Sequence, residues 1–177
     1  MRIERRTSET SVTVDLARGT GTAVIRTDVP FLNHMMITLA RYSGLDVTLE
    51  GTGDLKHHLV EDVAIAFGAA FAEILPPSCG RYGESTVAMD DAVVQVVLDA
   101  GGRPFYRGPL PSTLYDHWMR SFADNARMTL HIIVIRGTDR HHIVEAAFKA
   151  LGFALRDAIR DNDAVFSTKG AVLLRKT

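Results

Sequence analysis

The stretch HHIVEAAFKALGFALRDAI, residues 141–159, has a near copy earlier in the chain, HHLVEDVAIAFGAAFAEIL at residues 57–75. Seven of the nineteen aligned positions are identical, including both histidines and the glutamate that follows the first histidine by four residues. Apolar residues recur at helical spacing in both copies, which predicts two long and largely buried helices. We therefore expect one structural unit to occur twice in the chain.

The similarity continues upstream of each helix. His34 precedes His57 by 23 residues, and His117 precedes His141 by 24 residues. A chance match is easy to accept for alanines but not for histidines at matched spacing. The sequence therefore predicts an internal duplication of about 80 residues.

The remaining segments predict the other elements of each unit. Alternating or β-branched residues predict strands at 11–16, 21–27, 45–50, 81–87, 93–99 and 129–135, and shorter helices are expected from Pro30 and over 114–126. Gly19, Thr20 and Gly21 separate the first two strands, which suggests a hairpin, and residues 103–111 are expected to be a loop. Each half is then β-β-α-β-α, an α+β fold with helices packed on one face of each sheet.

Composition limits the class of protein. The chain has 177 residues, 46% hydrophobic and 23% charged, with a net charge of −1. These values fit a soluble globular protein and give no overall field that favours nucleic acid or a membrane surface. The single cysteine, Cys79, excludes an intrachain disulfide, and the N-terminus lacks the apolar segment of a signal peptide. We expect a cytoplasmic protein with neither nucleic acid nor a membrane as partner.

The histidines predict a metal centre. Residues at i and i+4 share one face of a helix, so His57 pairs with Glu61 and His141 with Glu145. The histidine next to each pair, His58 or His142, lies about 100° round the helix and is available to a different metal. One such motif alone is usually an ordinary surface cluster, but two in register favour metal binding. Imidazole and carboxylate suit Mn²⁺, Fe²⁺ or Zn²⁺. His131 lies inside an expected strand and is interpreted as sheet packing.

The motifs in chain order resemble those of the imidazoleglycerol-phosphate dehydratase family over about residues 5–170. They are RRTSET, PFLNHM, the first His-His-x-x-Glu segment, GRYG, MDDA, LDAGGRP, the second His-His-x-x-Glu segment and STKG. The resemblance implies dehydration of imidazole glycerol phosphate to imidazole acetol phosphate in histidine biosynthesis. It also implies a ribosomal protein S5 domain 2-like fold, two Mn²⁺ per active site (with other divalent transition metals as alternatives), and a homo-oligomer of 24 subunits with active sites at subunit interfaces.

The resemblance also assigns metal ligands. Site one comprises His34, His58, His141 and Glu145, and site two comprises His57, Glu61, His117 and His142. Helix geometry gives only the His-Glu pairs. The assignment of His58 to site one and of His142 to site two is implied by the resemblance to the family. With two metals on the substrate's imidazole, the ring can become anionic and expel the neighbouring hydroxyl.

The remaining roles come from the resemblance as well. The catalytic set is Glu9, His57, Glu61, His142 and Glu145, with Glu9 as general acid/base; the alternative for Glu9 is a solvated surface carboxylate. The substrate-binding set is Glu9, His34, Tyr42, His57, His58, Glu61, Arg81, Arg103, His141, Lys149, Ser167, Thr168 and Lys169. Within it, the arginines and the STKG segment would hold the phosphate. The expected organisation is one domain over residues 1–177, with repeats at about 5–78 and 80–162 and a substrate-binding tail at 163–177.

Several positions depart from the usual family pattern. Asn33 and Tyr42 replace an aspartate and a histidine, as in some archaeal members, and Leu59 and Asp139 also differ. The loop before the first histidine pair, GDLKHH, is short and lacks the usual acidic pair. Since an acidic residue there can orient a ligand histidine, we expect weaker metal binding or altered closure over the substrate.

Two alternative functions remain open on the sequence. One is a metal-dependent hydrolase or isomerase on the same scaffold, which would keep the eight ligands and lose phosphate recognition. The other is a non-catalytic metal-binding assembly protein, which would need neither Glu9 nor the arginines.

Overall fold

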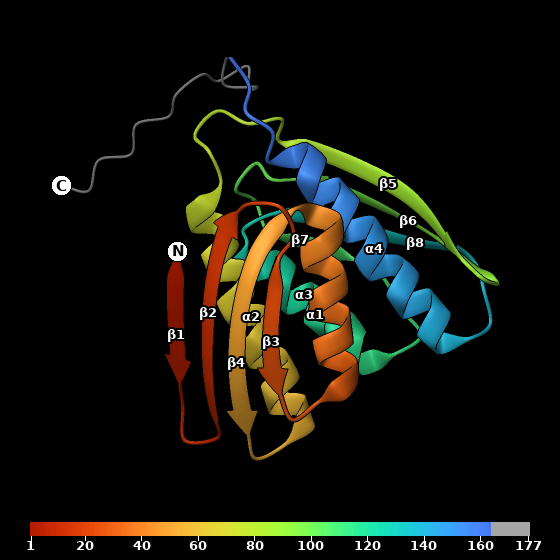
Figure 1. The fold of residues 1–177 in the computed structure, drawn as a ribbon. Coiled ribbons are helices and arrows are strands. Elements are labelled where there is room, and N and C mark those ends of the chain that lie inside the picture. The colour runs from red at the N-terminus through yellow and green to blue at the C-terminus, as the bar shows by residue number, and fades with distance from the viewer. Residues whose placement is uncertain (164–177) are drawn as a thin grey trace.

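The computed structural model describes residues 1–163, which form two four-stranded sheets with the helices between them (Figure 1). The first half contains β1 (Arg2–Arg6), β2 (Thr10–Arg18), β3 (Ala23–Thr27), α1 (Pro30–Ser43), β4 (Leu45–Gly53) and α2 (Lys56–Ile74). The second half contains β5 (Tyr82–Met89), β6 (Ala92–Asp99), β7 (Phe105–Arg107), α3 (Thr113–Asn125), β8 (Thr129–Arg136) and α4 (Arg140–Ala158). The predicted α+β class with two similar halves is confirmed.

The two sheets have the same topology. Their strand orders are β1-β2-β4-β3 and β5-β6-β8-β7, and the last strand of each is parallel to its neighbour. The short strands β1 and β7 were not predicted, because β1 is rich in charged residues and β7 has only three residues. Residues 105–107 therefore form a strand inside the segment that was expected to be a loop.

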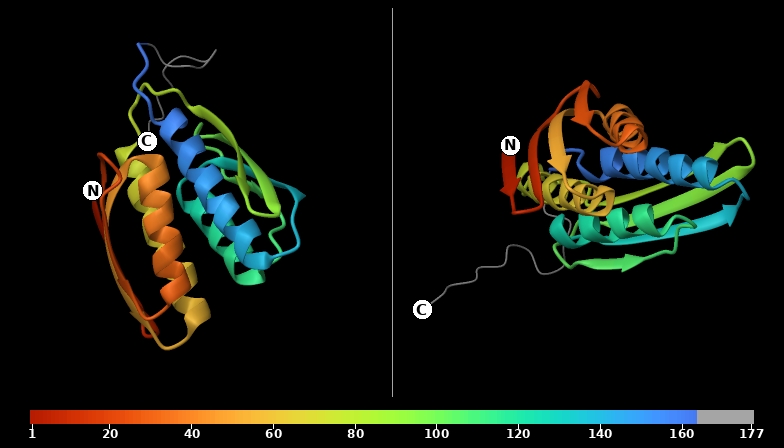
Figure 2. Two further views of the ribbon diagram at one scale, coloured as in Figure 1. Left: turned by 45° about the vertical axis from the view of Figure 1, so that its right-hand side comes forward. Right: turned by 90° about the horizontal axis from the view of Figure 1, so that it is seen from below.

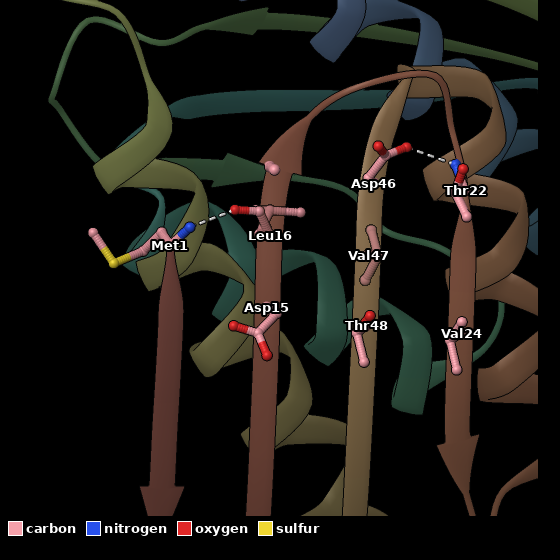
Figure 3. A pocket seen from close by; sticks show the side chains of 9 residues that line it. Met1, Asp15, Leu16, Thr22, Val24, Asp46, Val47 and Thr48 are labelled. Atoms are coloured by element: carbon pink, nitrogen blue, oxygen red, sulfur yellow. Dashed lines mark hydrogen bonds between the residues drawn. The ribbon is translucent and has the colours of Figure 1, made fainter.

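The predicted hairpin over residues 11–27 is wrong. β4 pairs with β2 along nine residues and separates it from β3. The glycine-containing turn is instead attached to the start of β4, where the Asp46 carboxylate accepts hydrogen bonds from the backbone N–H groups of Thr20, Gly21 and Thr22. The same aspartate lines a shallow pocket on this sheet (Figure 3). Because its carboxylate already serves the turn, we do not consider this pocket a functional site.

The helices form two layers between the sheets (Figure 2). Helices α1 and α2 cover the first sheet, and α3 and α4 cover the second. Across the middle, α1 packs on α4 and α2 packs on α3, so each helix pair joins the two halves of the chain. Large apolar side chains, including Phe67, Trp118, Phe122 and Phe148, are fully buried there. The N-terminal ends of α1, α2 and α4 lie at one end of the molecule (Figure 1). No helix among the described residues is long and apolar enough to span a membrane.

The repeated glycines let the paired helices approach closely. A Cβ on Gly152 of α4 would lie 2.6 Å from the Cβ of Tyr42 on α1, and a Cβ on Gly68 of α2 would lie 2.7 Å from the carbonyl oxygen of Phe122 on α3. Both distances are shorter than a van der Waals contact of a Cβ atom with carbon or oxygen. The duplicated glycine therefore fixes the spacing of both helix pairs.

We expect Gly152→Ala to destabilise the protein by about 1–3 kcal/mol, since overpacking forces the helices apart. Urea unfolding followed by circular dichroism measures this free energy. Glu73→Ala, at an exposed position of α2, is the control and should change stability by no more than about 0.5 kcal/mol. Equal stability of Gly152→Ala and the parent protein would show that the helix spacing is not constrained there.

Candidate metal centre

Cluster one consists of His34 on α1 and of His141 and Glu145 on α4. The Oε2 atom of Glu145 lies 3.2 Å from Nε2 of His34 and 3.1 Å from Nε2 of His141. Glu145 is buried, although both histidines remain exposed. Burial acts to raise the pKa of Glu145, but Lys149 and His34 oppose it, and the net result is a lowered pKa. An ionised carboxylate thus faces two imidazoles contributed by opposite halves of the chain.

Cluster two is the pseudo-equivalent group of His57 and Glu61 on α2 with His117 on α3. Oε1 of Glu61 lies 3.2 Å from Nε2 of His117, and Oε2 lies 3.7 Å from Nε2 of His57. The two imidazole rings stack with centroids 5.1 Å apart. Nε2 of His117 is buried and is not aligned for a hydrogen bond with any residue of the described chain, Glu61 included. This orphaned nitrogen points to a further binding partner.

Both clusters have donor atoms that suit a divalent metal ion. In each, one carboxylate oxygen and two imidazole nitrogens lie within 4.8 Å of one another. Ligand atoms about 2.1 Å from one ion and at right angles to each other are about 3 Å apart. The His-Glu separations are 3.1 and 3.2 Å in cluster one and 3.2 and 3.7 Å in cluster two, so three of the four are close to this value. The residues present therefore fit a metal with several further coordination positions.

His58 belongs to neither of these clusters. Its Nδ1 lies 2.8 Å from Oδ1 of Asp54 and 3.6 Å from Oε2 of Glu9, and these residues form a third group with metal-ligand chemistry. The hydrogen bond with Asp54 raises the pKa of His58 and lowers the pKa of Asp54. The short loop lacks the usual acidic pair but still supplies a carboxylate to its histidine, because Asp54 lies in that loop, four residues before His58. The expected effect on metal binding or closure stays a prediction.

His142 is likewise separate from cluster two. Its Nδ1 lies 2.8 Å from Asp91 and its Nε2 lies 3.3 Å from Asp90, both in the β5–β6 turn. The pKa of Asp91 is lowered, first by the backbone N–H of Thr138 and then by His142, whose own pKa is raised. The Asp139 side chain caps α4 by accepting from the N–H groups of residues 141 and 142.

Sequence reasoning missed the carboxylates that hold the lone histidines. Asp54 could have been found from its i,i+4 spacing to His58, which is the same spacing as in the metal-binding pairs. Asp90 and Asp91 belong to the MDDA motif, for which no role was predicted, and the contact of Asp91 with His142 spans 51 residues. Long-range contacts of this kind leave no periodic signal in a sequence.

Tyr42 and Lys149 lie behind cluster one. The Lys149 ammonium is 2.9 Å from Oε1 of Glu145 and 5.9 Å from the centre of the Tyr42 ring. An open pocket beside the cluster is lined by residues that include Phe31, Tyr115 and His141.

His131 is half-buried on β8 and packs against Phe105, with ring centroids 5.5 Å apart. It does not belong to any of the described clusters.

The two arginines predicted to bind phosphate lie at the other end of the second sheet. Arg81 forms a two-pronged ion pair with Asp99, at 2.6 and 2.9 Å, and its backbone N–H donates to Ala158 at the end of α4. The carbonyl of Arg103 accepts from Thr129, which pairs with Asp99 in the sheet. Thirteen residues of helix separate Glu145 from Ala158, which corresponds to about 20 Å. Arg81 and cluster one of one chain are thus far apart. Ser167, Thr168 and Lys169 lie outside the described residues.

Comparison with known proteins gives one consistent result. The family model described as imidazoleglycerol-phosphate dehydratase matches residues 27–155. A protein of that description from Cereibacter sphaeroides is 46% identical over 95% of this chain and 96% of its own length. One from Methanococcoides burtonii is 39% identical over 97% of this chain and 98% of its own length. The crystal structure of the Pyrococcus furiosus enzyme superposes with a TM-score of 0.87 and 37% identity, covering 96% of this chain and all of that one. The chain therefore belongs to the imidazoleglycerol-phosphate dehydratase family, the hydro-lyases of histidine biosynthesis.

Proposed function

We propose that this chain dehydrates imidazole glycerol phosphate to imidazole acetol phosphate with two Mn²⁺ ions, one at each cluster. The observation that carries the proposal is the duplicated arrangement of clusters one and two, each with two imidazoles and one carboxylate. Other divalent transition metals have compatible ligand preferences. The imidazole ring of the substrate offers two nitrogens, which matches a centre with two metals.

The metal ligands are proposed to be completed by the lone histidines. Site one would be His34, His141 and Glu145 with His58, and site two would be His57, Glu61 and His117 with His142. When bound, the metals act as Lewis acids toward the ring and help it to release the neighbouring hydroxyl. Asp54 and Asp91 each accept at Nδ1 of a lone histidine, and such a carboxylate fixes the ring orientation and raises its basicity as a ligand.

Glu9 is proposed as the group that moves the proton. The reaction removes a proton from the carbinol carbon next to the one that loses hydroxide, and the resulting enol becomes the ketone. The Glu9 carboxylate lies 3.6 Å from the His58 ring and is largely exposed, so it can reach a substrate bound beside that histidine. In this scheme His57, Glu61, His142 and Glu145 hold the metals at which the reaction takes place.

We propose that each active site forms between copies of the chain. His58 and His142 lie apart from the clusters of their own chain. Arg81 contacts the C-terminal end of α4, about 20 Å along that helix from Glu145 of cluster one. A second copy can supply these groups where the first copy lacks them. The family resemblance points to a particle of 24 subunits, with Arg81, Arg103, Ser167, Thr168 and Lys169 holding the phosphate and Tyr42 and Lys149 close to the substrate.

The direct test is turnover by metal-stripped protein. Without metal we expect no imidazole acetol phosphate, and with Mn²⁺ restored to two ions per chain we expect full activity, because the ring needs both Lewis acids. Product is followed by its absorbance as the enolate in alkali, and bound metal by elemental analysis. Assembled, metal-loaded protein that makes no product would contradict the dehydratase and favour a paralogous hydrolase or isomerase, or an assembly protein.

A further inference from the structure

The two clusters differ in one charged neighbour. The repeat aligns Lys149, four residues after Glu145, with Ile65, four residues after Glu61. The Lys149 ammonium lies 2.9 Å from Oε1 of Glu145, whereas the residue at the matching position after Glu61 is the uncharged Ile65. Among residues 1–163, the ion pairs of Glu61 are with histidines. The duplication has therefore been broken next to a proposed metal ligand.

Lys149 is held firmly in this position. Its side chain is 17% exposed, its Nζ lies 2.9 Å from the sulfur of Met89, and the Tyr42 ring lies beneath it. Since Lys149 occupies Oε1, Glu145 presents Oε2 alone to His34 and His141. Glu61 instead has one oxygen near each of its two histidines. The carboxylate of cluster one therefore has a lysine ammonium beside it, and the carboxylate of cluster two has only histidines as ion-pair partners among residues 1–163.

Building on the proposed two-metal function, we propose that the clusters bind divalent metal with unequal affinity, cluster two tightly and cluster one weakly, because Lys149 offsets the charge of Glu145. A unit charge about 5 Å from a doubly charged ion changes its affinity roughly tenfold even in a water-like medium, and more in a partly buried site. Burial of the Glu145 side chain works in the opposite direction, because a carboxylate that is already ordered loses less entropy on binding. That gain is limited to one side chain, and the charge of Lys149 outweighs it.

This inequality has a consequence for activity. Turnover that needs both metals follows the filling of the weaker site, so the supply of free Mn²⁺ controls the enzyme through cluster one. The lone histidines have similar surroundings, because His58 and His142 each have one carboxylate 2.8 Å from Nδ1 and a second carboxylate within 3.6 Å of the ring, so the main charge difference between the sites is Lys149. Lys149 is thus a positioning residue that sets the metal affinity through Glu145.

A Mn²⁺ titration of metal-stripped protein tests the proposal, with free Mn²⁺ measured by its electron paramagnetic resonance signal. The parent protein should show two classes of site that differ at least about tenfold in Kd. Glu145→Gln should remove the weak class and Glu61→Gln the tight class. Lys149→Ile should tighten the weak class at least about tenfold, and the reciprocal Ile65→Lys should weaken the tight class. Lys56→Ile, which removes an exposed lysine beside cluster two, should leave both classes unchanged.

Each outcome is decisive. Equal Kd values for the two sites of the parent protein would overturn the inequality and leave the two-metal function intact. Unchanged Kd values in both swap variants would do the same. Fewer than two Mn²⁺ per parent chain would overturn the proposed function as well. Because the two swaps change different helices, a folding defect in one of them, seen by circular dichroism, still leaves the other to decide.

Discussion

Replacing Glu9 with glutamine is expected to lower kcat by about 10²- to 10⁴-fold, the usual contribution of a general acid/base. The amide is nearly the same size but cannot accept the substrate's proton at neutral pH. Since Glu9 also lies 3.6 Å from His58, metal content must be measured together with kcat, and we expect both metals to be retained.

The control for this variant is Glu4→Gln. Glu4 lies on β1 and its carboxylate pairs with the exposed side chain of Arg2, so the substitution removes the same charge away from the clusters. We expect its kcat to be unchanged. Near-normal kcat in Glu9→Gln would mean that this residue is a solvated surface carboxylate.

Replacing Arg81 with alanine is expected to reduce kcat/KM by at least about a hundredfold, since two-pronged, charge-assisted contacts with phosphate are among the stronger hydrogen bonds. Asp99 holds the guanidinium in a partly buried position. Most of the loss should appear as a raised KM. Arg107→Ala, at an exposed position of β7, is the control and should leave both constants unchanged.

Arg81→Ala also removes an ion pair, so its free energy of unfolding must be compared with that of the parent. Loss of stability without a change in KM would mean that Arg81 has a structural role only. Loss of substrate affinity in a folded variant would support its role in phosphate binding.

The long helices and their His-Glu pairs could be predicted because both depend on local spacing. An i,i+4 pair shares a helix face wherever the helix lies, and the duplication made the pattern recognisable. The strand order could not be predicted in this way. The segment from residue 11 to 27 has the local signature of a hairpin, but Asp46, 24 residues after Thr22, holds the turn and β4 lies between the two strands.

Part of the candidate site could likewise be predicted from the sequence, and part of it depends on long-range packing. The family pattern predicted four ligands for each metal, and the structure brings three of each four together within one chain. The contacts of His142 with Asp91 and the distance between Arg81 and Glu145 depend on how whole elements pack. The lysine that distinguishes the two clusters is visible in the sequence only after the repeats are aligned, and its contact with Glu145 is visible only in the structure.

We propose that each active site combines a metal cluster from one chain with the arginines of another. Arg81→Ala and Glu145→Gln proteins, each with little activity when the substrate concentration is below the parent's KM, can be stripped of metal, mixed, reassembled with Mn²⁺ and assayed at that concentration. If the site forms between chains, about a quarter of the sites in a random mixture contain both intact parts, and the activity should recover to about that fraction of the parent's. A mixture that assembles normally and stays as inactive as its components would contradict the account.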